Sequence, residues 1–373
     1  MATPIIRMQD IHKQYHVDSL VVPALRGIDL NIERGEFVAI TGPSGSGKST
    51  LVRMLNRLIE PTSGAILVDG HDVAQLNTGE LVKFRRRHTG MVFQSFALMP
   101  HLTVLENVAF GPELGGVPKK KAAQAAKEAL EQVGLNGWEN VPPDQLSGGM
   151  QQRVGLARAL AVDPDILLMD EAFSALDPLI RAEMQDELLR LHDRSKRTVV
   201  FISHDIDEAF KLGDRIAIME GGRVVQVGTP DDILQNPADD YVHAFFRGVD
   251  PAKVITAGEI AGSPKTTVIH QSRGRESPQM VLRQLSGQEA DFAYILDPDE
   301  RFIGIVSADS LQQQLQRPKK EQQLDHAFLR DVRPAAVSDS MQNILPEVAS
   351  NPWPLPVLDE QGVYQGAVSK AQF

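Results

Sequence analysis

A glycine-rich stretch of this chain has the residue types needed to hold the phosphates of a nucleotide. It reads Gly42-Pro43-Ser44-Gly45-Ser46-Gly47-Lys48-Ser49-Thr50 and lies between the apolar run 37–40 and the run 51–55. A strand, a glycine loop and a helix in this order are what a phosphate-binding loop requires, although an ordinary βα turn can also be rich in glycine. The loop turns N–H groups toward phosphate oxygens, its lysine neutralises the β- and γ-phosphates, and the next hydroxyl holds Mg²⁺. We therefore predict nucleotide contacts from Gly42, Ser44, Gly45, Gly47, Lys48, Ser49 and Thr50, with Ser49 also at the metal.

Two adjacent carboxylates end a second apolar run. Residues 166–169 precede Asp170 and Glu171, as a central parallel strand would deliver them to its C-terminal edge. Asp170 would hold Mg²⁺ through water, and Glu171 would polarise the attacking water. Because neighbouring residues of a strand point to opposite faces, we expect the two acids to have different roles.

Gln94 and His204 stand at the ends of two further strand-like runs, 91–93 and 198–203. The Gln94 amide oxygen could coordinate Mg²⁺ and sense the γ-phosphate, and His204 could contact that phosphate. Taken alone, a glutamine is usually polar surface, and a histidine at a strand end is more often structural. Both alternatives stay open on these residues alone.

A second helix start carries another potential anion site. Ser147 stands at an N-cap position, and Gly148 and Gly149 leave backbone N–H groups bare. Since one phosphate loop has little use for a second such site, we expect it to complete the nucleotide site of a second copy across a twofold interface. A plain capped helix is the alternative. The turn 174–177 could communicate between the copies, and we expect Asp177, at its end, to contact nucleotide.

The elements that must position these residues follow from the remaining pattern. Residues 5–40 predict a β-rich entry that contains Tyr15, an aromatic that could stack on adenine or be a partly buried structural tyrosine. Residues 95–145 change character and predict a helical insertion. The apolar residues at 98–108 are either its core or the lining of a groove for a partner's helix. Residues 215–228 predict a closing hairpin.

Composition limits the class of protein. A length of 373 residues suggests two or three domains, and a net charge of −11 argues against general affinity for nucleic acid. No run approaches the roughly 18 apolar residues of a membrane span. The start, 1–4, shows no basic segment leading into an apolar one, so we expect no export signal. Zero cysteines exclude disulfides and are compatible with the cytosol.

Taken in order, six features of this sequence resemble the full motif set of an ATP-binding cassette (ABC) ATPase. They are the phosphate loop, Gln94, the run 146–150, the run 167–171, the turn 174–177 and His204. The resemblance covers roughly 5–248. It implies an α/β P-loop NTPase core with an antiparallel β subdomain and a helical subdomain at about 95–160. It also implies a head-to-tail dimer in which Ser147 and Gly149 of one copy reach the ATP of the other, and adenine stacking on Tyr15. Met150 stands where many cassettes have glutamine.

The stretches 170–181, 201–209 and 245–250 resemble, more narrowly, the ATPase subunit of glycine betaine/proline osmoprotectant importers. This resemblance implies a peripheral subunit on the cytoplasmic side of the plasma membrane. A separate permease, fed by a solute-binding protein, would dock the 95–145 region. Importers of choline, carnitine, an amino acid or a metal ion are alternatives. So are soluble cassette proteins of DNA repair or translation, although those generally carry two cassettes or long coiled coils.

After a connector at 249–264, with 258–264 expected to be loose, the region 265–373 contains a duplication. Residues 295–297 recur at 357–359 and residues 302–307 recur at 364–369, both at an offset of 62 (357 − 295 and 364 − 302). Each copy reads as a strand, an acidic turn, a strand and a serine that can cap a helix. The region resembles paired cystathionine-β-synthase-type (CBS) modules, which implies regulation by ionic strength or by an adenine nucleotide. A generic βαβ dimerisation domain is the alternative.

The second copy departs from this pattern. Only four residues, 370–373, follow Ser369, and Pro346 is expected to interrupt the preceding helix. We therefore expect the second module to be incomplete and to lack a full ligand pocket.

Overall fold

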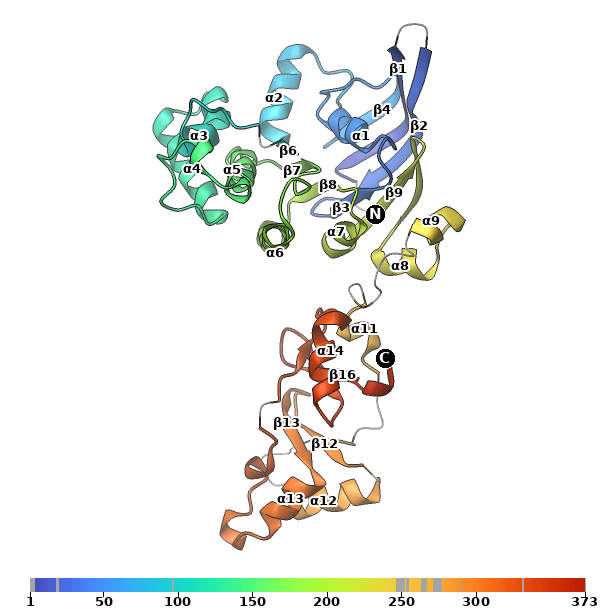
Figure 1. The fold of residues 1–373 in the computed structure, drawn as a ribbon, viewed down its shortest axis with the longest axis vertical. Helices are drawn as coiled ribbons and strands as arrows, with labels where there is room; N and C mark the ends of the chain where they lie inside the picture. Colours follow the sequence, from blue (N-terminus) through green and yellow to red (C-terminus); the bar gives the residue numbers. More distant parts are fainter. Residues whose placement is uncertain are drawn as a thin grey trace. The chain divides into compact units, whose positions relative to one another are not determined.

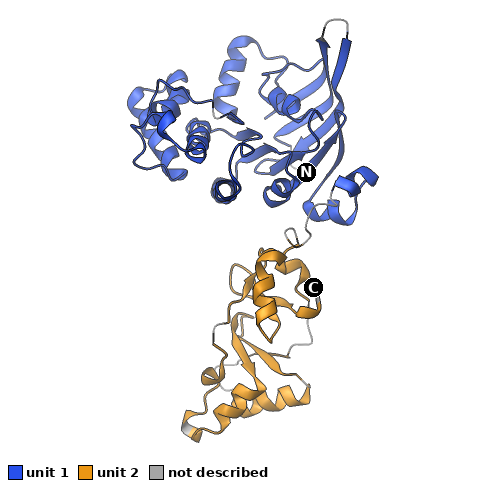
Figure 2. Ribbon diagram, in the orientation of Figure 1, with its two compact units in different colours: residues 1–249 blue, residues 250–373 orange. Residues whose placement is uncertain are grey.

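The computed structural model describes residues 4–17, 20–95, 97–245, 252, 255–262, 267–270, 277–288, 290–330 and 332–372. The chain divides into two compact units, residues 1–249 and 250–373 (Figure 2). The first unit ends one residue beyond the boundary predicted at 248.

A six-stranded sheet forms the centre of the first unit, in the order β10-β9-β3-β8-β7-β6. The five strands from β9 to β6 run parallel, and β10 pairs antiparallel with β9. All residues of β3, β7 and β8 are buried, which explains their continuous apolar runs. The strands are β3 (Phe37–Thr41), β6 (Thr89–Phe93), β7 (Ile166–Asp170), β8 (Thr198–Ile202), β9 (Arg215–Glu220) and β10 (Arg223–Gly228).

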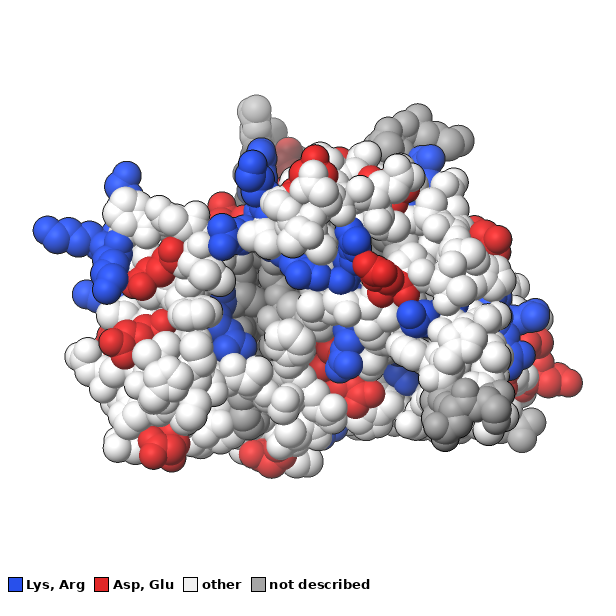
Figure 3. All heavy atoms as spheres, turned by 90° about the horizontal axis from the view of Figure 1, so that it is seen from above, with Lys and Arg blue, Asp and Glu red and all other residues white. Residues whose placement is uncertain are grey.

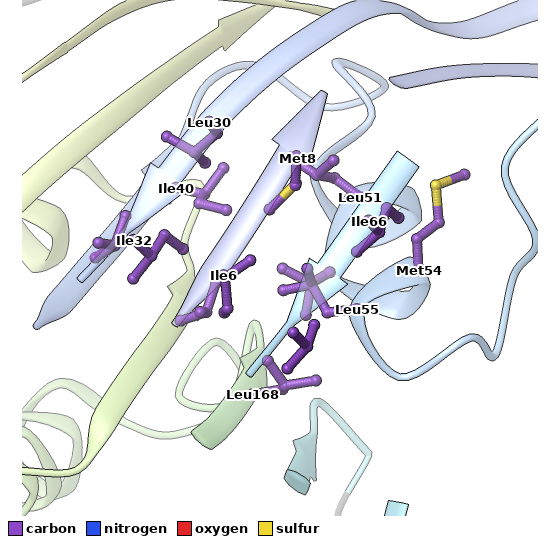
Figure 4. Packing of buried hydrophobic residues seen from close by; sticks show 14 of the residues in the cluster. Ile6, Met8, Leu30, Ile32, Ile40, Leu51, Met54, Leu55, Ile66 and Leu168 are labelled. Carbon is purple, nitrogen blue, oxygen red and sulfur yellow. The ribbon is translucent and has the colours of Figure 1, made fainter. Parts of the chain in front are cut away.

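A second, four-stranded antiparallel sheet has the order β2-β1-β4-β5 and matches the predicted β-rich entry. Its strands are β1 (Ile6–Val17), β2 (Leu20–Ile32), β4 (Ser63–Val68) and β5 (His71–Asp72). Apolar residues of this sheet, of helix α1 (Lys48–Leu55) and of the six-stranded sheet form one buried cluster; Ile6, Leu51 and Leu168 represent the three elements in Figure 4. Because α1 follows the glycine loop, this packing fixes the loop.

Most of the remaining helices of the first unit gather into a helical subdomain or flank the central sheet. Figure 1 shows α3, α4 and α5 together to one side of that sheet. Val104 and Val108 are buried, so the run 98–108 supplies part of the insertion core, whereas Phe110 and Leu114 are exposed. The helices are α2 (Thr78–His88), α3 (Val104–Leu114), α4 (Lys119–Gln132), η1 (Pro143–Gln145), α5 (Gly148–Leu160), α6 (Pro178–Ser195), α7 (Ile206–Leu212), α8 (Pro230–Gln235) and α9 (Asp240–Phe245).

The surface carries both signs of charge. Figure 3 shows basic and acidic side chains interspersed across one face. Among the described residues, no helix has both the length and the apolar character needed to cross a membrane.

The second unit contains two three-stranded sheets of the same design, β11-β12-β13 and β14-β15-β16, each with one parallel and one antiparallel pairing. The first copy comprises β11 (Thr267–His270), α12 (Pro278–Gly287), β12 (Phe292–Leu296), β13 (Phe302–Ser307) and α13 (Ala308–Leu315). The second comprises β14 (Ala335–Ala336), α14 (Met341–Ser350), β15 (Leu355–Leu358), β16 (Tyr364–Val368) and η5 (Lys370–Gln372). Between the copies lie η3 (Lys319–Glu321) and η4 (Leu324–Ala327).

The two copies share equivalent hydrogen bonds in their acidic turns. Asp297 Oδ1 accepts from the N–H groups of Asp299 and Arg301, at 2.9 and 2.8 Å. Asp359 Oδ1 accepts from the N–H groups of Gln361 and Val363, both at 2.9 Å. The predicted acidic turn is therefore present in both copies, 62 residues apart (359 − 297).

Two predictions about the second unit are wrong. Residues 258–260 belong to helix α11 (Ala257–Ile260) and not to a loose connector, because Ala257 is buried in the core of the second module. Pro346 lies inside α14 and does not end it, since Ile344 and Val348 on either side anchor the helix in that core. Within the predicted connector 249–264, residues 249–251, 253, 254, 263 and 264 lie outside the described ranges.

The last helix of the second module is short, as the sequence predicts, and helix α11 packs on the core of this module. In the first module, Leu311 of α13 closes the core. The second has only the short turn η5 at the equivalent place, and Ala257 and Ile260 of α11 pack on its core instead. A segment that precedes the first module therefore contributes to the core of the second, and the lack of a full ligand pocket there stays a prediction.

Candidate nucleotide site

Four neighbouring parallel strands bring the predicted site residues to one edge of the central sheet. The glycine loop follows β3, His204 follows β8, Asp170 ends β7 with Glu171 directly after it, and Gln94 follows β6. These strands are adjacent in the order β3-β8-β7-β6. Since the carboxyl ends of parallel strands share an edge, residues far apart in the sequence meet there.

The glycine loop needs its glycines for packing as well as for close approach to a ligand. Gly42, Gly45 and Gly47 have φ angles of 143°, 81° and 102°, in the region that favours glycine. A Cβ at Gly42 would lie 2.0 Å from the Met219 carbonyl oxygen, and one at Gly47 would lie 2.6 Å from Leu25 Cδ2. Helix α1 begins at Lys48, and Gly47 supplies no side-chain cap, so its first N–H groups are available to an anion.

Lys48 is held at this loop with only 5% of its surface exposed. Its Nζ donates hydrogen bonds to the carbonyl oxygens of Gly42 and Pro43, at 2.7 and 3.0 Å. Burial lowers the pKa of Lys48, and the nearby Glu171 and Asp170 oppose that shift. The side chain is thus a desolvated cation donor beside the loop, which suits it to neutralise phosphate.

The residues predicted to hold the metal are partly assembled. Ser49 Oγ donates to Asp170 Oδ1 at 2.7 Å, across 121 positions of sequence. Gln94 is exposed, and its Nε2 donates to Ser174 Oγ at 3.1 Å. Hydroxyl, carboxylate and amide oxygens are the ligand types that Mg²⁺ prefers. The residues present therefore fit the ion.

Arg53 is a site residue that the sequence did not single out. Its Nε lies 3.0 Å and its Nη2 2.9 Å from Asp170 Oδ2. Arg53 stands four positions after Ser49 on α1 (53 − 49), so the two share a helix face, and this spacing was the available signal. The Arg53 guanidinium thus pairs with one carboxylate oxygen of Asp170, and Ser49 donates its hydrogen bond to the other.

Glu171 and Asp170 are separated by a break in the strand, and not by the alternation between faces that was predicted for neighbouring strand residues. Strand β7 ends at Asp170, and Glu171 has a φ of 48°, so a break in the strand separates the two acids and the alternation rule does not apply. A left-handed conformation at a non-glycine residue costs of order 1–3 kcal/mol and is typical of functional sites. Glu171 Oε2 lies 3.4 Å from His204 Nδ1.

Ser174 supports this strained residue and was also missed as a contact residue. Its hydroxyl donates to the Glu171 carbonyl oxygen at 2.9 Å and accepts the Gln94 amide hydrogen bond. Gln94 and Glu171 are thereby tied through one side chain. The amide oxygen of Gln94 remains the group available to a metal.

Tyr15 lies beside the helix that follows the glycine loop. Its hydroxyl is 3.4 Å from Thr50 Oγ1, and 36% of its surface is exposed. Lys13 Nζ lies 5.0 Å from the centre of the ring. This position is compatible with stacking on an adenine whose phosphates lie in the loop, and that role stays a prediction.

The second predicted anion site begins helix α5. Ser147 is its N-cap and accepts from the Met150 N–H at 3.3 Å, and Gly148 is the first helical residue. A Cβ at Gly149 would lie 2.4 Å from Ile180 Cγ2 of α6, so this glycine also permits close helix packing. Asp177, predicted to contact nucleotide, accepts from the Ile180 N–H at 3.1 Å and caps α6. Contact with a second copy's nucleotide remains a prediction for all of these residues.

Gly149→Ala is expected to lower ATP hydrolysis roughly tenfold, because the added methyl group must displace the start of α5 or α6. The double variant Gly149→Ala/Ile180→Ala restores the space between the helices. If Gly149 also approaches a phosphate, the phosphate-release rate of the double variant stays low. Full recovery would contradict the phosphate role and leave packing as the sole reason for the glycine.

Another group of metal-ligand types, Asp69, His88 and Asp165, lies within 4.8 Å of one another. Arg34 Nη2 already pairs with Asp69 Oδ1 at 2.6 Å, and its Nη1 is 3.8 Å from Asp165 Oδ1. Because these acids have a basic partner, we assign no metal to this group.

Comparison with known proteins agrees with this geometry. The sequence model of the ABC transporter family matches residues 25–174. A glycine betaine/proline betaine transport system ATP-binding protein, ProV of Salmonella typhimurium, is 51% identical over 346 residues, which are 93% of this chain and 86% of ProV. The chain belongs to the ATP-binding subunits of ABC transporters.

Two further comparisons extend this result. The trimethylamine N-oxide transport system ATP-binding protein TmoW of Ruegeria pomeroyi is 53% identical over 276 residues, 74% of this chain and 81% of TmoW. Two dimeric structures of the bacterial ABC cassette MJ0796, one a post-hydrolysis state bound to ADP and Pi, match at a TM-score of 0.56 and 38% identity. They cover 60% of this chain and 98% of the cassette. The predicted fold and the ATPase activity coupled to transport are therefore confirmed.

Proposed function

We propose that this chain powers import of a methylated ammonium solute, with glycine betaine or proline betaine as the first candidates. The observation that carries the proposal is the 51% identity with ProV, which spans 93% of the chain and so includes most of the second unit. TmoW makes trimethylamine N-oxide the second candidate. Glycine betaine and trimethylamine N-oxide share a trimethylated nitrogen. The ATPase subunit does not contact the cargo, and the site itself therefore does not discriminate between them.

The proposed working form is a head-to-tail dimer on the cytoplasmic side of the membrane, bound to a permease that a solute-binding protein supplies. The ATP phosphates lie against the loop 42–50 of one copy and against Ser147 and Gly149 of the other. The dimeric MJ0796 cassettes support this arrangement. The run 98–108, which is partly buried, and the exposed Phe110 and Leu114 would face the permease.

In the proposed hydrolysis, the site residues hold the metal, bind the phosphates and activate the attacking water. Mg²⁺, when bound, neutralises charge on the β- and γ-phosphates, and Ser49, Asp170 and Gln94 would hold it. Lys48 binds the phosphates. Glu171 orients and polarises the attacking water, while His204, 3.4 Å from that carboxylate, contacts the γ-phosphate.

Uptake of radiolabelled solute tests the proposal. Cells of the organism that produces this chain are expected to lose osmotically stimulated uptake of glycine betaine when the chain is deleted. Expression of the unaltered chain is expected to restore this uptake. Expression of the Glu171→Gln variant is expected not to restore uptake, because transport requires ATP turnover. Unlabelled proline betaine, trimethylamine N-oxide, choline, carnitine and proline serve as competitors and rank the cargo.

Undiminished uptake of every one of these solutes in cells without the chain would overturn the transport proposal. The rival reading, a soluble cassette protein without a transport role, predicts that the chain purifies without a permease from membranes solubilised in mild detergent. Co-purification with the permease of the same transport system would reject that rival.

For the second unit we propose regulation of the ATPase by CBS-like modules that respond to ionic strength or to an adenine nucleotide. Its two modules share a packed aromatic core, in which Tyr294 stacks on Tyr364 at 5.5 Å and donates a hydrogen bond to the Pro354 carbonyl oxygen. A change in either module can therefore reach the other.

A further inference from the structure

A buried carboxylate lies close to the nucleotide site, and the proposed hydrolysis of ATP gives it no role. Glu208 of α7 is 5% exposed. It accepts hydrogen bonds from the Ser203 hydroxyl at 2.5 Å and from the Gln185 amide at 3.1 Å. The Arg181 guanidinium approaches it at 3.7 Å. Burying a carboxylate is costly unless it is paired and hydrogen-bonded, so each of these partners stabilises an otherwise unfavourable group.

This cluster holds the chain on both sides of His204. Ser203, which precedes the histidine, donates its hydroxyl hydrogen to Glu208 and accepts the N–H of Asp205 at 2.9 Å. Asp205, which follows the histidine, has its Oδ2 3.5 Å from Arg181 Nη1. The backbone that carries His204 is therefore fixed from α7 and from α6 together.

Arg181 extends the same cluster to the turn that supports Glu171. Its Nη2 donates to the Leu176 carbonyl oxygen at 3.1 Å, within the turn 174–177. Ser174, at the start of that turn, holds the Glu171 carbonyl oxygen. The pair of the buried Glu208 and the partly exposed Arg181 thus contacts the segments that place His204 and Glu171, whose side chains lie 3.4 Å apart.

We propose that Glu208, with Arg181, is a positioning group that sets the placement of His204 for ATP hydrolysis. The inference rests on the proposed role of His204 at the γ-phosphate. Glu208 is buried beneath this segment and acts through Ser203, not on the nucleotide. Because small misplacements of a reacting group slow chemistry strongly, loss of the cluster affects the hydrolytic step more than ATP binding.

Electrostatics distinguish this role from simple stabilisation of the fold. Burial raises the pKa of the Glu208 carboxyl, the Ser203 hydrogen bond opposes that shift, Asp205 adds to it, and Arg181 and Gln185 lower it. A carboxyl whose pKa is raised on folding contributes stability only when it is protonated, and this contribution is lost as pH rises through the folded pKa. Glu208→Gln removes that loss. The variant also replaces one acceptor oxygen with an NH₂ group, which Gln185 can meet with its amide oxygen, so it is expected to unfold at pH 8 at a temperature close to that of the unaltered protein.

The first test is the steady-state ATPase rate of the full chain. Glu208→Gln is expected to lower kcat roughly tenfold and to leave KM for ATP within about twofold, because the substitution keeps the shape of the side chain but removes its pairing with Arg181. Glu187→Gln, on the same helix as Arg181, is the matched control, since Glu187 is partly exposed and pairs with the exposed Arg190 at 2.8 Å. An unchanged kcat in Glu208→Gln would overturn the inference.

A double-mutant cycle with His204 tests the route of the effect. Single-turnover hydrolysis at enzyme excess is measured for His204→Ala and for His204→Ala/Glu208→Gln. If Glu208 acts through His204, the two rates are equal, since no histidine is left to position. A further tenfold loss in the double variant would overturn positioning through His204 and leave the proposed function intact. Hydrolysis by His204→Ala at the unaltered rate would instead reject the proposed role of His204 and this inference with it.

Discussion

Glu171→Gln is expected to lower ATP hydrolysis at least about 100-fold while leaving ATP affinity within a few-fold of that of the unaltered chain. General base catalysis contributes on the order of 10²–10⁴ in rate, and a glutamine amide cannot polarise the attacking water as a carboxylate does. The hydrogen bond that supports this position uses the backbone carbonyl of residue 171, so it survives the substitution. Phosphate release measures turnover, and equilibrium binding of a fluorescent ATP analogue measures affinity. Glu220→Gln, at the exposed end of β9, is the matched control.

The same variant also tests the proposed dimer. If ATP joins two copies and hydrolysis releases them, Glu171→Gln is expected to elute as a dimer with ATP and Mg²⁺ and as a monomer without nucleotide. Light scattering coupled to size exclusion measures the mass. A variant that remains monomeric at saturating ATP, even with the permease present, would contradict the ATP-sandwich arrangement. Hydrolysis near the unaltered rate would contradict the assignment of Glu171.

The central sheet could be predicted because its strands are buried on both faces. The apolar runs of β3, β7 and β8 leave no alternation between faces, and a residue of the site ends each strand or follows it within two positions. The start of α5 could be predicted for a local reason, since Ser147 caps it. In these elements, local sequence and tertiary burial favour the same structure.

The errors occurred where local signals opposed tertiary burial. Gly258 suggested a connector, and Pro346 suggested the end of a helix. Both lie in helices because Ala257, Ile344 and Val348 are buried in one core of the second unit. A glycine or proline costs a helix about 1–3 kcal/mol, and burial of two or three apolar side chains offsets this.

The site was predicted in its parts but not in its connections. Gln94, Asp170, Glu171 and His204 could each be found because they end apolar runs. Their supporting contacts from Arg53, Ser174 and Glu208 depend on the strand order β3-β8-β7-β6 and on how α6 and α7 pack, which one sequence does not reveal. Glu208 did leave one signal, since it stands beside the buried Ala209 and Phe210 on α7.

Removal of residues 250–373 is expected to leave ATP hydrolysis within about twofold at low salt and to abolish its response to ionic strength or to adenine nucleotide. All predicted nucleotide and metal residues lie in the first unit, and the second unit has hydrophobic clusters of its own. The MJ0796 cassette, matched over 98% of its length by 60% of this chain, shows that a cassette of this fold can exist without such a unit. The truncated chain is therefore expected to fold.

The measurement compares the full and truncated chains, each with the permease in vesicles, from 0.05 to 0.5 M KCl and with ATP, ADP or AMP added separately. Screening changes strongly over this range, as the Debye length falls from about 14 to about 4 Å, so interactions between exposed charges weaken in both proteins. Only a response confined to the full chain therefore belongs to the second unit. Tyr294→Leu in the full chain is the matched variant, because it disrupts the stacking between the modules without shortening the protein. We expect it to weaken the salt response, whereas the same salt or nucleotide response in the truncated and full chains would reject regulation by this unit.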